Sequence, residues 1–587
     1  MKTKHLTIAA SLIAVVLSAC SAMAAPAPAA RPAAAPAAPA ATSAPAAVEA
    51  PAQSRREAAK SSNAYPTQSG RAAAPAEPPK ATEAPAAAPA AAAPAAPRPI
   101  TQPAQDSTGP RPITSDRAAI EPTSVVVQPT PQDETFKDYG VNPWINTARD
   151  HFSTFALDVD TASYSVMRRY ITDGSLPPFE SVRAEEYINY FKQDYALPPQ
   201  DATFAVYADG APSPFHTDGS YLLRVGVQGY AIPESQRKSA NLALVVDESG
   251  SMADGNRIQL VKDSLTYLVN KLRPDDTVSL VAFSNDARIV LNPTSARNRR
   301  AILDAINGLQ PTNGTNTQSG LYLAYQILND NFRSDAVNRV VLATDGVANQ
   351  GITDPQQILD SMGKYYRRDI YLTAVGFGRG NFNDDFLQRL ADKGDGSYSY
   401  VDSLDEGYKV FGENIVSALQ PIAKDAKTQV DFNADVVAEY RLIGYEDRAV
   451  ADQDFRNDSV DAGELNAGHN ATAIYAVKLR PNMRGKIATV FLRWQEVGAA
   501  GNAGAVKEIA GDVFTTDLAP SFEATSARYQ MNVVVAEFAE KLRQSPYSTL
   551  PMSVLSQYAN NVARALANDT DVQEFAQLVQ RASSMNR

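Results

Sequence analysis

The amino-acid sequence predicts a doubly wound α/β domain with a mostly parallel sheet, inserted between two strand-rich flanks. Three observations carry this prediction. Near-continuous apolar strands alternate with amphipathic helices through the middle of the chain, strands of alternating polarity lie on both sides of that region, and the last part of the chain is helical. A long Ala/Pro-rich segment precedes all of these elements and predicts a disordered tether.

The first residues of the chain read MKTKHLTIAASLIAVVLSAC, with two lysines followed by an apolar run from Leu6 to Leu17. This pattern predicts a secretory signal peptide. The last four residues look like a bacterial lipobox, in which Cys20 carries lipid and becomes the mature N-terminus; cleavage after Ala24 is the alternative. We therefore expect a lipid anchor in the cell envelope, and Ser21 favours the outer membrane, on its periplasmic or surface side.

Composition limits the chemistry that the chain can perform. Cys20 is the single cysteine among 587 residues, so neither a disulfide framework nor thiol catalysis is expected in the folded part. The formal net charge of −11 argues against nucleic acid as a partner, because phosphate binding needs a basic surface. The sequence predicts no catalytic residue and no organic cofactor site. The leading hypothesis is that the protein is not an enzyme.

The composition changes along the chain divide it into five parts. These are a lipoprotein signal peptide (1–20), an Ala/Pro-rich linker (21–135), an N-terminal α+β region (136–239), the α/β domain (240–420) and a C-terminal region that is first strand-rich and then helical (421–587). Prolines hold the linker extended, so the folded part can stand well away from a membrane.

The N-terminal region begins with an expected strand at 154–158 and a helix that starts near Thr161. A second helix, 181–191, and two alternating strands, 203–210 and 220–229, follow.

Strands and helices then alternate through the α/β domain. The expected strands are 241–247, 277–284, 287–293, 338–346, 370–378 and 397–403, and the expected helices between them are 257–272, 299–309, 320–332 and 354–369.

Strands return in the C-terminal region. They are expected at 427–433, 438–446, 471–481 and 486–496, and helices are expected at 531–544, 550–566 and 571–582. Neither flank has enough strands for a sandwich of its own. We therefore expect the segments at about 200–230 and 425–510 to pair into one β-sandwich with the α/β domain inserted.

Oxygen-bearing side chains follow several of the predicted strands. The strand 241–247 ends on Asp247, and Ser249 and Ser251 follow at two-residue spacing; Thr315 lies in a loop before a helix, and Asp345 ends another strand in Thr-Asp-Gly. Ligands of doubly wound sheets bind beyond the carboxyl ends of the strands. Carboxylate and hydroxyl oxygens there suit Mg²⁺, Mn²⁺ or Ca²⁺.

Together these residues resemble the von Willebrand factor type A domain and its metal-ion-dependent adhesion site. Asp247, Ser249 and Ser251 match D-x-S-x-S, Thr315 matches the loop threonine and Asp345 matches the Thr-Asp-Gly aspartate. The resemblance implies that these five residues hold Mg²⁺, Mn²⁺ or Ca²⁺. It also implies that an Asp or Glu carboxylate of a protein partner completes the coordination.

The resemblance extends beyond the α/β domain. The segments NPWINTARDHFSTFALDVDTASYSVMRRYITDGSLPP, AKDAKTQVDFN and RLIGYEDRAVADQDF and the helical tail are similar to the conserved flanking regions of a family of bacterial type A domain lipoproteins. The resemblance covers about residues 137 to 587. The family implies a metal-bridged binding protein without a known substrate.

Other interpretations of these motifs are open. Asp247 and the two serines could cap the following helix. The segment LDVDTAS resembles the D-x-D-x-T of haloacid dehalogenase phosphatases at Asp158 and Asp160, but Ala162 stands where that motif has threonine. A metal-dependent hydrolase is therefore one alternative function. Another is an envelope assembly or scaffolding factor whose flanks bind the partner, with a regulatory metal site.

Two further motifs have simpler explanations. GFGRGN, 376–381, lacks the third glycine of a dinucleotide loop and is expected to be a loop near the cation. The acidic run 452–464 lacks the spacing of a known calcium loop and is expected to be a solvated loop.

Electrostatic repulsion between Asp247 and Asp345 is expected wherever both lie at one edge with no metal between them. On this basis, Asp247→Ala or Asp345→Asn would leave the stability of the metal-free protein unchanged or slightly higher.

Overall fold

A computed structural model describes most of the chain after the tether. The described residues are 134, 136–157, 159–199, 201–346, 350–362, 369–378, 383–414, 420–460, 462–498 and 503–585. Cys20, the linker and Asp158 lie outside these ranges, so the expectations for them stay predictions. Within the described ranges, no helix combines the length and the apolar composition that crossing a bilayer requires.

A six-stranded sheet forms the centre of the α/β domain, in the order β10-β9-β8-β5-β6-β7. Its strands are β5 (Ser239–Asp247), β6 (Thr277–Phe283), β7 (Ala287–Ser295), β8 (Ala336–Thr344), β9 (Ile370–Phe377) and β10 (Tyr398–Val401). All neighbouring pairs are parallel except β6 with β7. The prediction of a mostly parallel, doubly wound sheet is confirmed.

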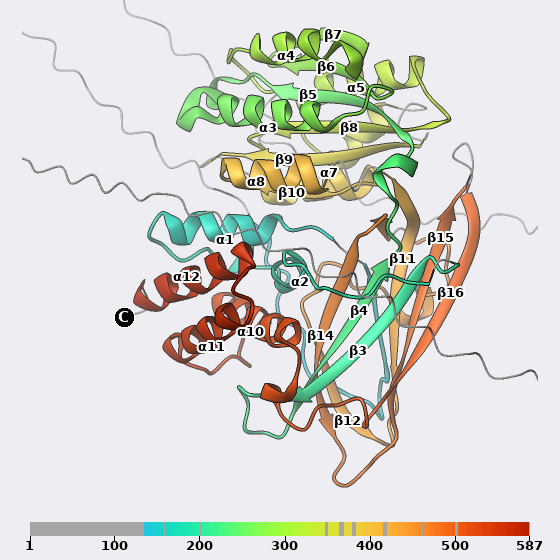
Figure 1. The fold of residues 1–587 in the computed structure, drawn as a ribbon, viewed down its shortest axis with the longest axis vertical. Helices are drawn as coiled ribbons and strands as arrows, with labels where there is room; N and C mark the ends of the chain where they lie inside the picture. Colours follow the sequence, from blue (N-terminus) through green and yellow to red (C-terminus); the bar gives the residue numbers. More distant parts are fainter. Residues whose placement is uncertain are drawn as a thin grey trace, which may run out of the picture. The chain divides into compact units, whose positions relative to one another are not determined.

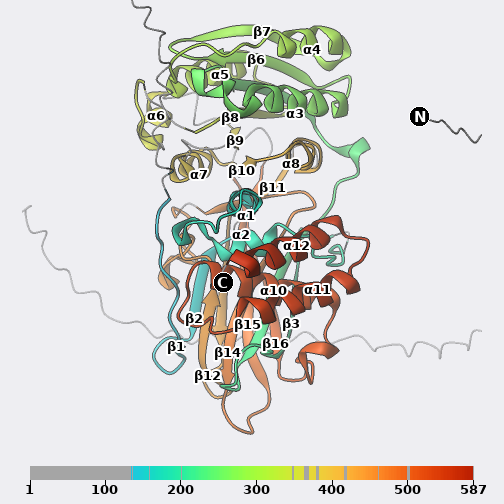
Figure 2. The same cartoon turned by 90° about the vertical axis from the view of Figure 1, so that its left-hand side faces the viewer.

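Helices cover both faces of this sheet (Figure 2). One face packs against α3 (Arg257–Lys271), α4 (Arg299–Asn307) and α8 (Leu404–Tyr408), and the other against α5 (Thr317–Asp330), α6 (Pro355–Ser361) and α7 (Asp384–Lys393). The strands β5, β8 and β9 are buried along their whole length, which is why their sequences are mostly apolar.

The strand order reverses at β5, because β5 pairs with β6 on one side and with β8 on the other. The connections that leave the carboxyl ends of β5 and β8 therefore diverge to opposite faces. This is the switch point at which doubly wound sheets bind their ligands.

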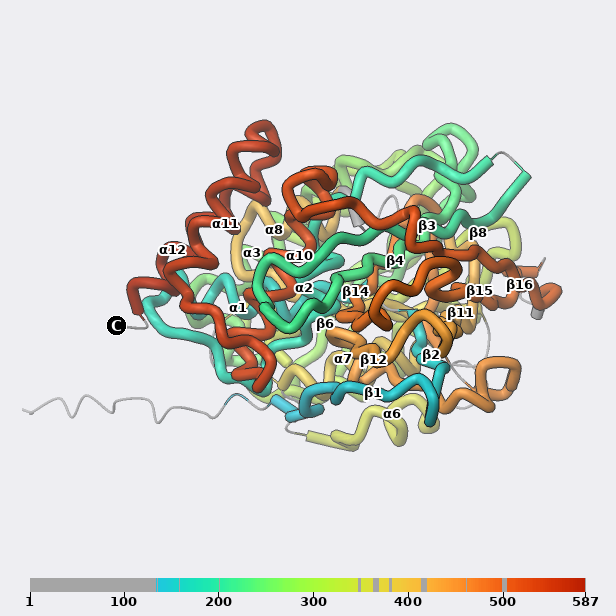
Figure 3. The backbone as a smooth tube through the Cα atoms, turned by 90° about the horizontal axis from the view of Figure 1, so that it is seen from below, coloured from blue at the N-terminus to red at the C-terminus, as the bar shows by residue number. Residues whose placement is uncertain are grey.

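A β-sandwich of two sheets combines strands from both flanks (Figures 1 and 3). The first sheet has the order β1 (Ile145–Asn146), β12 (Val437–Ile443), β14 (Asn470–Leu479), β4 (Tyr221–Gly229) and β3 (Phe204–Pro212). The second has the order β13 (Gly463–Asn466), β11 (Pro421–Phe432), β15 (Lys486–Val497) and β16 (Ala503–Phe514), with β2 (Phe152–Ala156) also paired to β11. β4 pairs with β14 across the inserted domain, which confirms the predicted single sandwich.

Three sandwich strands, β1, β13 and β16, are additional to the predicted elements. β16 is the edge strand of its sheet, is largely exposed, and contains Gly504 and Gly511, which weaken a strand pattern. The acidic run 452–464 is not a loop throughout, because it includes a 3₁₀ turn at Asp452–Asp454 and the start of β13. Short or solvent-facing strands lack the apolar alternation on which the prediction rests.

Helices from the two ends of the folded region share one apolar core. They are α1 (Ala162–Thr172), α2 (Ala184–Asn189), α10 (Ala527–Leu542), α11 (Met552–Ala565) and α12 (Thr570–Met585). The ring of Phe191, after α2, packs edge-on against Phe575 of α12, and Phe575 packs edge-on against Phe538 of α10. The three predicted helices of the C-terminal tail are all present.

Arginine side chains join the α/β domain to the flanks; three of them are buried, and the side chain of the fourth, Arg448, is 14% exposed. We call Arg168, Arg169, Arg183 and Arg448 the arginine interface. The pairs are Arg168 with Asp402 and Glu406, Arg169 with Tyr400, Arg183 with Asp384, and Arg448 with Asp392. A buried guanidinium needs a partner for its charge and its N–H groups. The contact between domain and flanks is therefore specified by charge as well as by packing.

Candidate metal centre

Asp247 is fixed at the carboxyl end of β5 by two hydrogen bonds. Its Oδ1 accepts from the backbone N–H of Ser249 at 2.7 Å, and its Oδ2 accepts from the hydroxyl of Thr344 at 2.6 Å. The side chain is fully buried. Because Thr344 ends β8, the two neighbouring strands together orient this carboxylate at the switch point.

The two serines and Asp345 lie beside Asp247. The hydroxyls of Ser249 and Ser251 are 3.0 Å apart, and the hydroxyl of Ser251 hydrogen-bonds to Asp345. Asp345 directly follows β8 and is buried. Ser249 precedes the 3₁₀ segment Gly250–Asn256 but makes no side-chain cap hydrogen bond to it. The helix-cap interpretation of this cluster is therefore not supported.

The loop that carries Thr315 is attached to the same edge. The Thr312 hydroxyl donates to the carbonyl of Glu248 at 3.1 Å, and the backbone N–H of Gln310 donates to the Glu248 carboxylate at 2.8 Å. Asn316 then caps α5 by accepting from the N–H of Ser319. Thr315 is buried at this position. The structure thus brings all five predicted residues to one edge of the sheet.

Burial and like charge make this a costly place for carboxylates. Burial, and to a smaller extent the charge of Asp345, raise the pKa of Asp247 to about 7, although the hydrogen bonds from Thr344 and Ser249 act to lower it. Burial also raises the pKa of Asp345. Two buried acids that share one site favour a cation between them.

Arg257 belongs to this cluster of residues, although the sequence did not single it out. Its Nη1 donates to Asp345 Oδ2 at 2.7 Å and to the carbonyl of Ser251 at 3.0 Å, and its side chain is 8% exposed. In the sequence, Arg257 only begins an amphipathic helix. Its contact with Asp345 joins residues 88 positions apart, which no local pattern reveals.

The donor set suits a hard divalent cation. Carboxylate oxygens of Asp247 and Asp345 and hydroxyl oxygens of Ser249, Ser251 and Thr315 are the ligand types that Mg²⁺, Mn²⁺ and Ca²⁺ take. No group of three or more His, Cys, Asp or Glu side chains is arranged to hold a metal among the residues that the structure describes. A metal here would therefore depend on the hydroxyls together with the two carboxylates.

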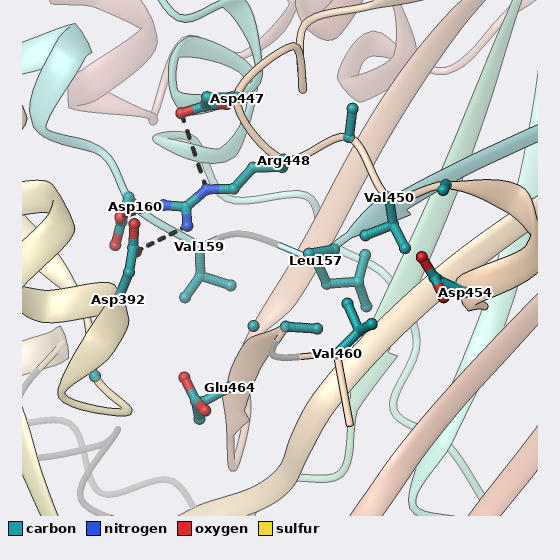
Figure 4. Close-up of a pocket in the computed structure, with 16 residues that line it drawn as sticks. Leu157, Val159, Asp160, Asp392, Asp447, Arg448, Val450, Asp454, Val460 and Glu464 are labelled. Carbon is teal, nitrogen blue, oxygen red and sulfur yellow. Dashed lines mark hydrogen bonds and ion pairs between the residues drawn. The ribbon is translucent and has the colours of Figure 1, made fainter. Parts of the chain in front are cut away.

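A pocket of about 360 Å³ lies away from the candidate metal centre, and Asp160 is one of the residues that line it (Figure 4). Asp160 accepts from the backbone N–H of Tyr398 at 2.7 Å and from Arg448 at 3.0 Å, while Arg448 also pairs with Asp392 at 2.8 Å. Asp160 is buried in this network, where it pairs with Arg448 of the arginine interface. This placement gives the hydrolase alternative no support from Asp160; Asp158 lies outside the described residues.

Comparison with known proteins agrees with the fold. The model of the von Willebrand factor type A domain matches residues 241–413, and a model described as von Willebrand factor matches residues 130–224. A third, described as uncharacterized protein YfbK, C-terminal, matches residues 417–585. The uncharacterized protein YfbK of Escherichia coli is 34% identical over 437 residues, which cover 71% of this chain and 75% of that protein.

The chain belongs to the YfbK family. The predicted resemblance to bacterial type A domain proteins with characteristic flanking regions is confirmed. Type A domains commonly mediate protein–protein interactions.

Other relatives of this YfbK-family protein share a smaller part of it. Uncharacterized protein sll0103 of Synechocystis is 34% identical over 189 residues, which cover 32% of this chain and 44% of that protein. Human inter-alpha-trypsin inhibitor heavy chain H4 is 31% identical over 159 residues, 26% of this chain and 17% of that protein. The chain thus spans less than half of these two proteins. A solved von Willebrand factor type A structure from Catenulispora acidiphila, 14% identical, covers 64% of this chain and 89% of its own with a TM-score of 0.37.

Proposed function

We propose that this YfbK-family protein is a cell-envelope lipoprotein whose type A domain binds a protein partner through Mg²⁺ or a similar cation, Mn²⁺ or Ca²⁺. Its ligands would be Asp247, Ser249, Ser251, Thr315 and Asp345, and an Asp or Glu carboxylate of the partner would complete the coordination. The observation that carries the proposal is the pair of buried carboxylates beside two hydroxyls at the switch point.

The ligand types explain why such a site would bind an acidic partner. Three of the five proposed ligands are neutral hydroxyls, and Arg257 pairs with one of the two aspartates, Asp345, so the protein would offset the charge of a divalent cation only in part. A bound ion of this kind is the largest local charge in its site. Held by these residues, the cation would attract a carboxylate from another protein.

Affinity capture tests the binding proposal. The immobilised full chain is expected to retain partners from an envelope extract in Mg²⁺, to release them in EDTA and to recover them when Mg²⁺ returns. Asp345→Asn should capture none of them. The matched control is Asp304→Asn, which removes the same charge from a side chain that is 71% exposed on α4, and it should behave as wild type. Capture that persists in EDTA and in Asp345→Asn would instead assign binding to the flanks, with a regulatory metal site.

Lipid attachment is tested at Cys20. The wild-type chain is expected to incorporate radiolabelled palmitate and to fractionate with membranes, because the lipobox cysteine is the acylation site. Cys20→Ser should incorporate none and should leave the membrane fraction. Equal labelling and equal fractionation of the two proteins would show that the anchor is not at this cysteine.

A further inference from the structure

The proposed metal centre already contains a cation of its own. The guanidinium of Arg257 lies 2.7 Å from Asp345 Oδ2 and is buried with that carboxylate. At close range in a buried site, a fixed unit charge has a large effect on any second cation. The question is what a buried arginine does beside ligands that are proposed to bind metal.

We propose that Arg257 is a built-in counter-cation that weakens metal binding at this site and strengthens the binding of a partner's carboxylate to the metal-loaded site. This inference rests on the proposed function. It assigns to Arg257 a positioning and charge-balancing role toward Asp345, and it makes Arg257 a determinant of specificity rather than a ligand.

Net charge gives the reason for these opposite effects. Asp247 and Asp345 carry two negative charges when ionised, and Arg257 reduces their sum to one. A divalent cation then leaves the site with one positive charge, which an acidic partner neutralises. Without Arg257, the same cation would be neutralised by the two aspartates alone. Metal would bind more tightly, and the loaded site would attract a carboxylate less strongly.

The local backbone is built to place this side chain. Gly255 and Asn256, with φ of 55° and 63°, both adopt the left-handed conformation and turn the chain into α3, which Arg257 begins. Gly378, which follows β9 with φ of 92°, lies against the side chain of Arg257. Any other residue at this position would place its Cβ 2.1 Å from Arg257 Nε. The space for the guanidinium therefore depends on a glycine.

The hydrogen bonding of Arg257 is incomplete. A gain in fold stability therefore does not account for its burial, whereas the charge that it places beside Asp345 does. Its Nε is buried and has no hydrogen-bond partner among the residues that the structure describes. A buried donor without a partner destabilises the folded chain. Groups that break such rules are concentrated at functional sites.

A second arginine at the same edge provides a matched control. Arg288 of β7 donates to Glu248 at 2.7 Å, and its side chain is 55% exposed. Glu248 is not among the proposed ligands. Arg288→Gln thus removes the same charge from the same edge without changing the partner of Asp345, and solvent screens its effect.

Titration of the purified full chain with Mg²⁺ by calorimetry tests the first half of the inference. Arg257→Met is expected to bind Mg²⁺ at least about tenfold more tightly than wild type, since it removes a buried like charge next to the ion. Arg257→Gln, which is uncharged but keeps an N–H donor, should shift affinity in the same direction if the methionine variant folds poorly. Arg257→Lys, which keeps the charge, and Arg288→Gln should stay within about threefold of wild type.

Acetate serves as the carboxylate probe for the second half. In the Mn²⁺-loaded chain, acetate displaces metal-bound water and lowers the relaxation enhancement of water protons. Arg257→Met should require at least about fivefold more acetate for the same change, whereas Arg257→Lys and Arg288→Gln should not.

The outcomes separate this inference from the proposed function. If wild type binds Mg²⁺ and Asp345→Asn does not, the metal site stands; equal or weaker Mg²⁺ binding by both uncharged Arg257 variants then overturns the counter-cation role alone. If wild type binds no metal but the uncharged variants do, Arg257 is itself the resident cation; the first half of the inference then holds, whereas the carboxylate half and the proposed function both fail. If none of them binds metal, both are wrong.

Discussion

Replacing Arg183 with methionine is expected to lower the free energy of unfolding by about 3–5 kcal/mol, because it leaves carboxylates buried without their cation. Arg183 donates from Nε to Glu186 and from Nη2 to Asp384 Oδ1 at 3.2 Å, and it pairs with Asp384 through Nη1 as well. Asp384 belongs to α7 of the α/β domain, whereas Arg183 and Glu186 belong to the flank. The loss should therefore weaken the attachment of the domain together with overall stability.

Urea unfolding, followed by far-ultraviolet circular dichroism and tyrosine fluorescence, measures this effect. Arg300→Met is the matched control, because Arg300 is 95% exposed and lies 3.8 Å from Asp304. Exposed pairs of this kind contribute about 0–1 kcal/mol, so the control should unfold close to wild type. An Arg183→Met protein that is as stable as Arg300→Met would show that the arginine interface does not stabilise the fold.

Asp247→Asn is expected to stabilise the metal-free protein at pH 8 by roughly 2–4 kcal/mol and to abolish the stabilisation by Mg²⁺. The pKa of Asp247 is raised from 3.8 in the unfolded chain to about 7 in the folded protein, chiefly by burial. Between these two values the folded state binds more protons than the unfolded state, so stability falls as pH rises. Asparagine removes this loss while it keeps a side-chain oxygen for the N–H of Ser249.

The pH range and the metal response make this prediction specific. The gain in the free energy of unfolding of Asp247→Asn over metal-free wild type should be largest above about pH 7. It should vanish near pH 4, where Asp247 of the folded wild type is protonated and, like asparagine, uncharged. Wild type should gain about 2.7 kcal/mol at a Mg²⁺ concentration 100 times its Kd, and the variant should gain none. Thermal melts at pH 5 and pH 8, with Mg²⁺ and with EDTA, provide the measurement. A variant with the Mg²⁺ shift of wild type would show that Asp247 is not a ligand.

The structure changes the expectation for Asp345. From the sequence, the loss of either aspartate leaves metal-free stability unchanged or slightly higher. Asp345, however, is paired with Arg257, whereas the hydrogen bonds of Asp247 come from neutral groups. Burial raises the pKa of Asp345 as well, but Asp345→Asn would leave the buried guanidinium of Arg257 without its carboxylate. We therefore expect Asp345→Asn to stabilise the metal-free protein less than Asp247→Asn does, in the same set of melts.

The sequence determined the elements whose burial repeats with a regular period. Strands such as β5, β8 and β9 are enclosed on both faces, so their apolar runs were sufficient to predict them, and the long C-terminal helices carry clear apolar faces. The five proposed ligands could be named because strand ends and short spacings place Asp247, Ser249 and Ser251 within one loop. Their convergence with Asp345 follows from the parallel order of the sheet.

The tertiary structure alone decided which charges meet. Arg257 reaches Asp345, Arg183 reaches Asp384 and Arg448 reaches Asp160 across separations of 88, 201 and 288 residues. Such pairs leave no periodic signal, since one buried charge looks the same in sequence as one on the surface. The edge strand β16 was hidden for a related reason, because its solvent-facing residues need not be apolar. Periodicity reports which face of an element is buried, whereas the partner of a buried charge is set only when distant segments pack together.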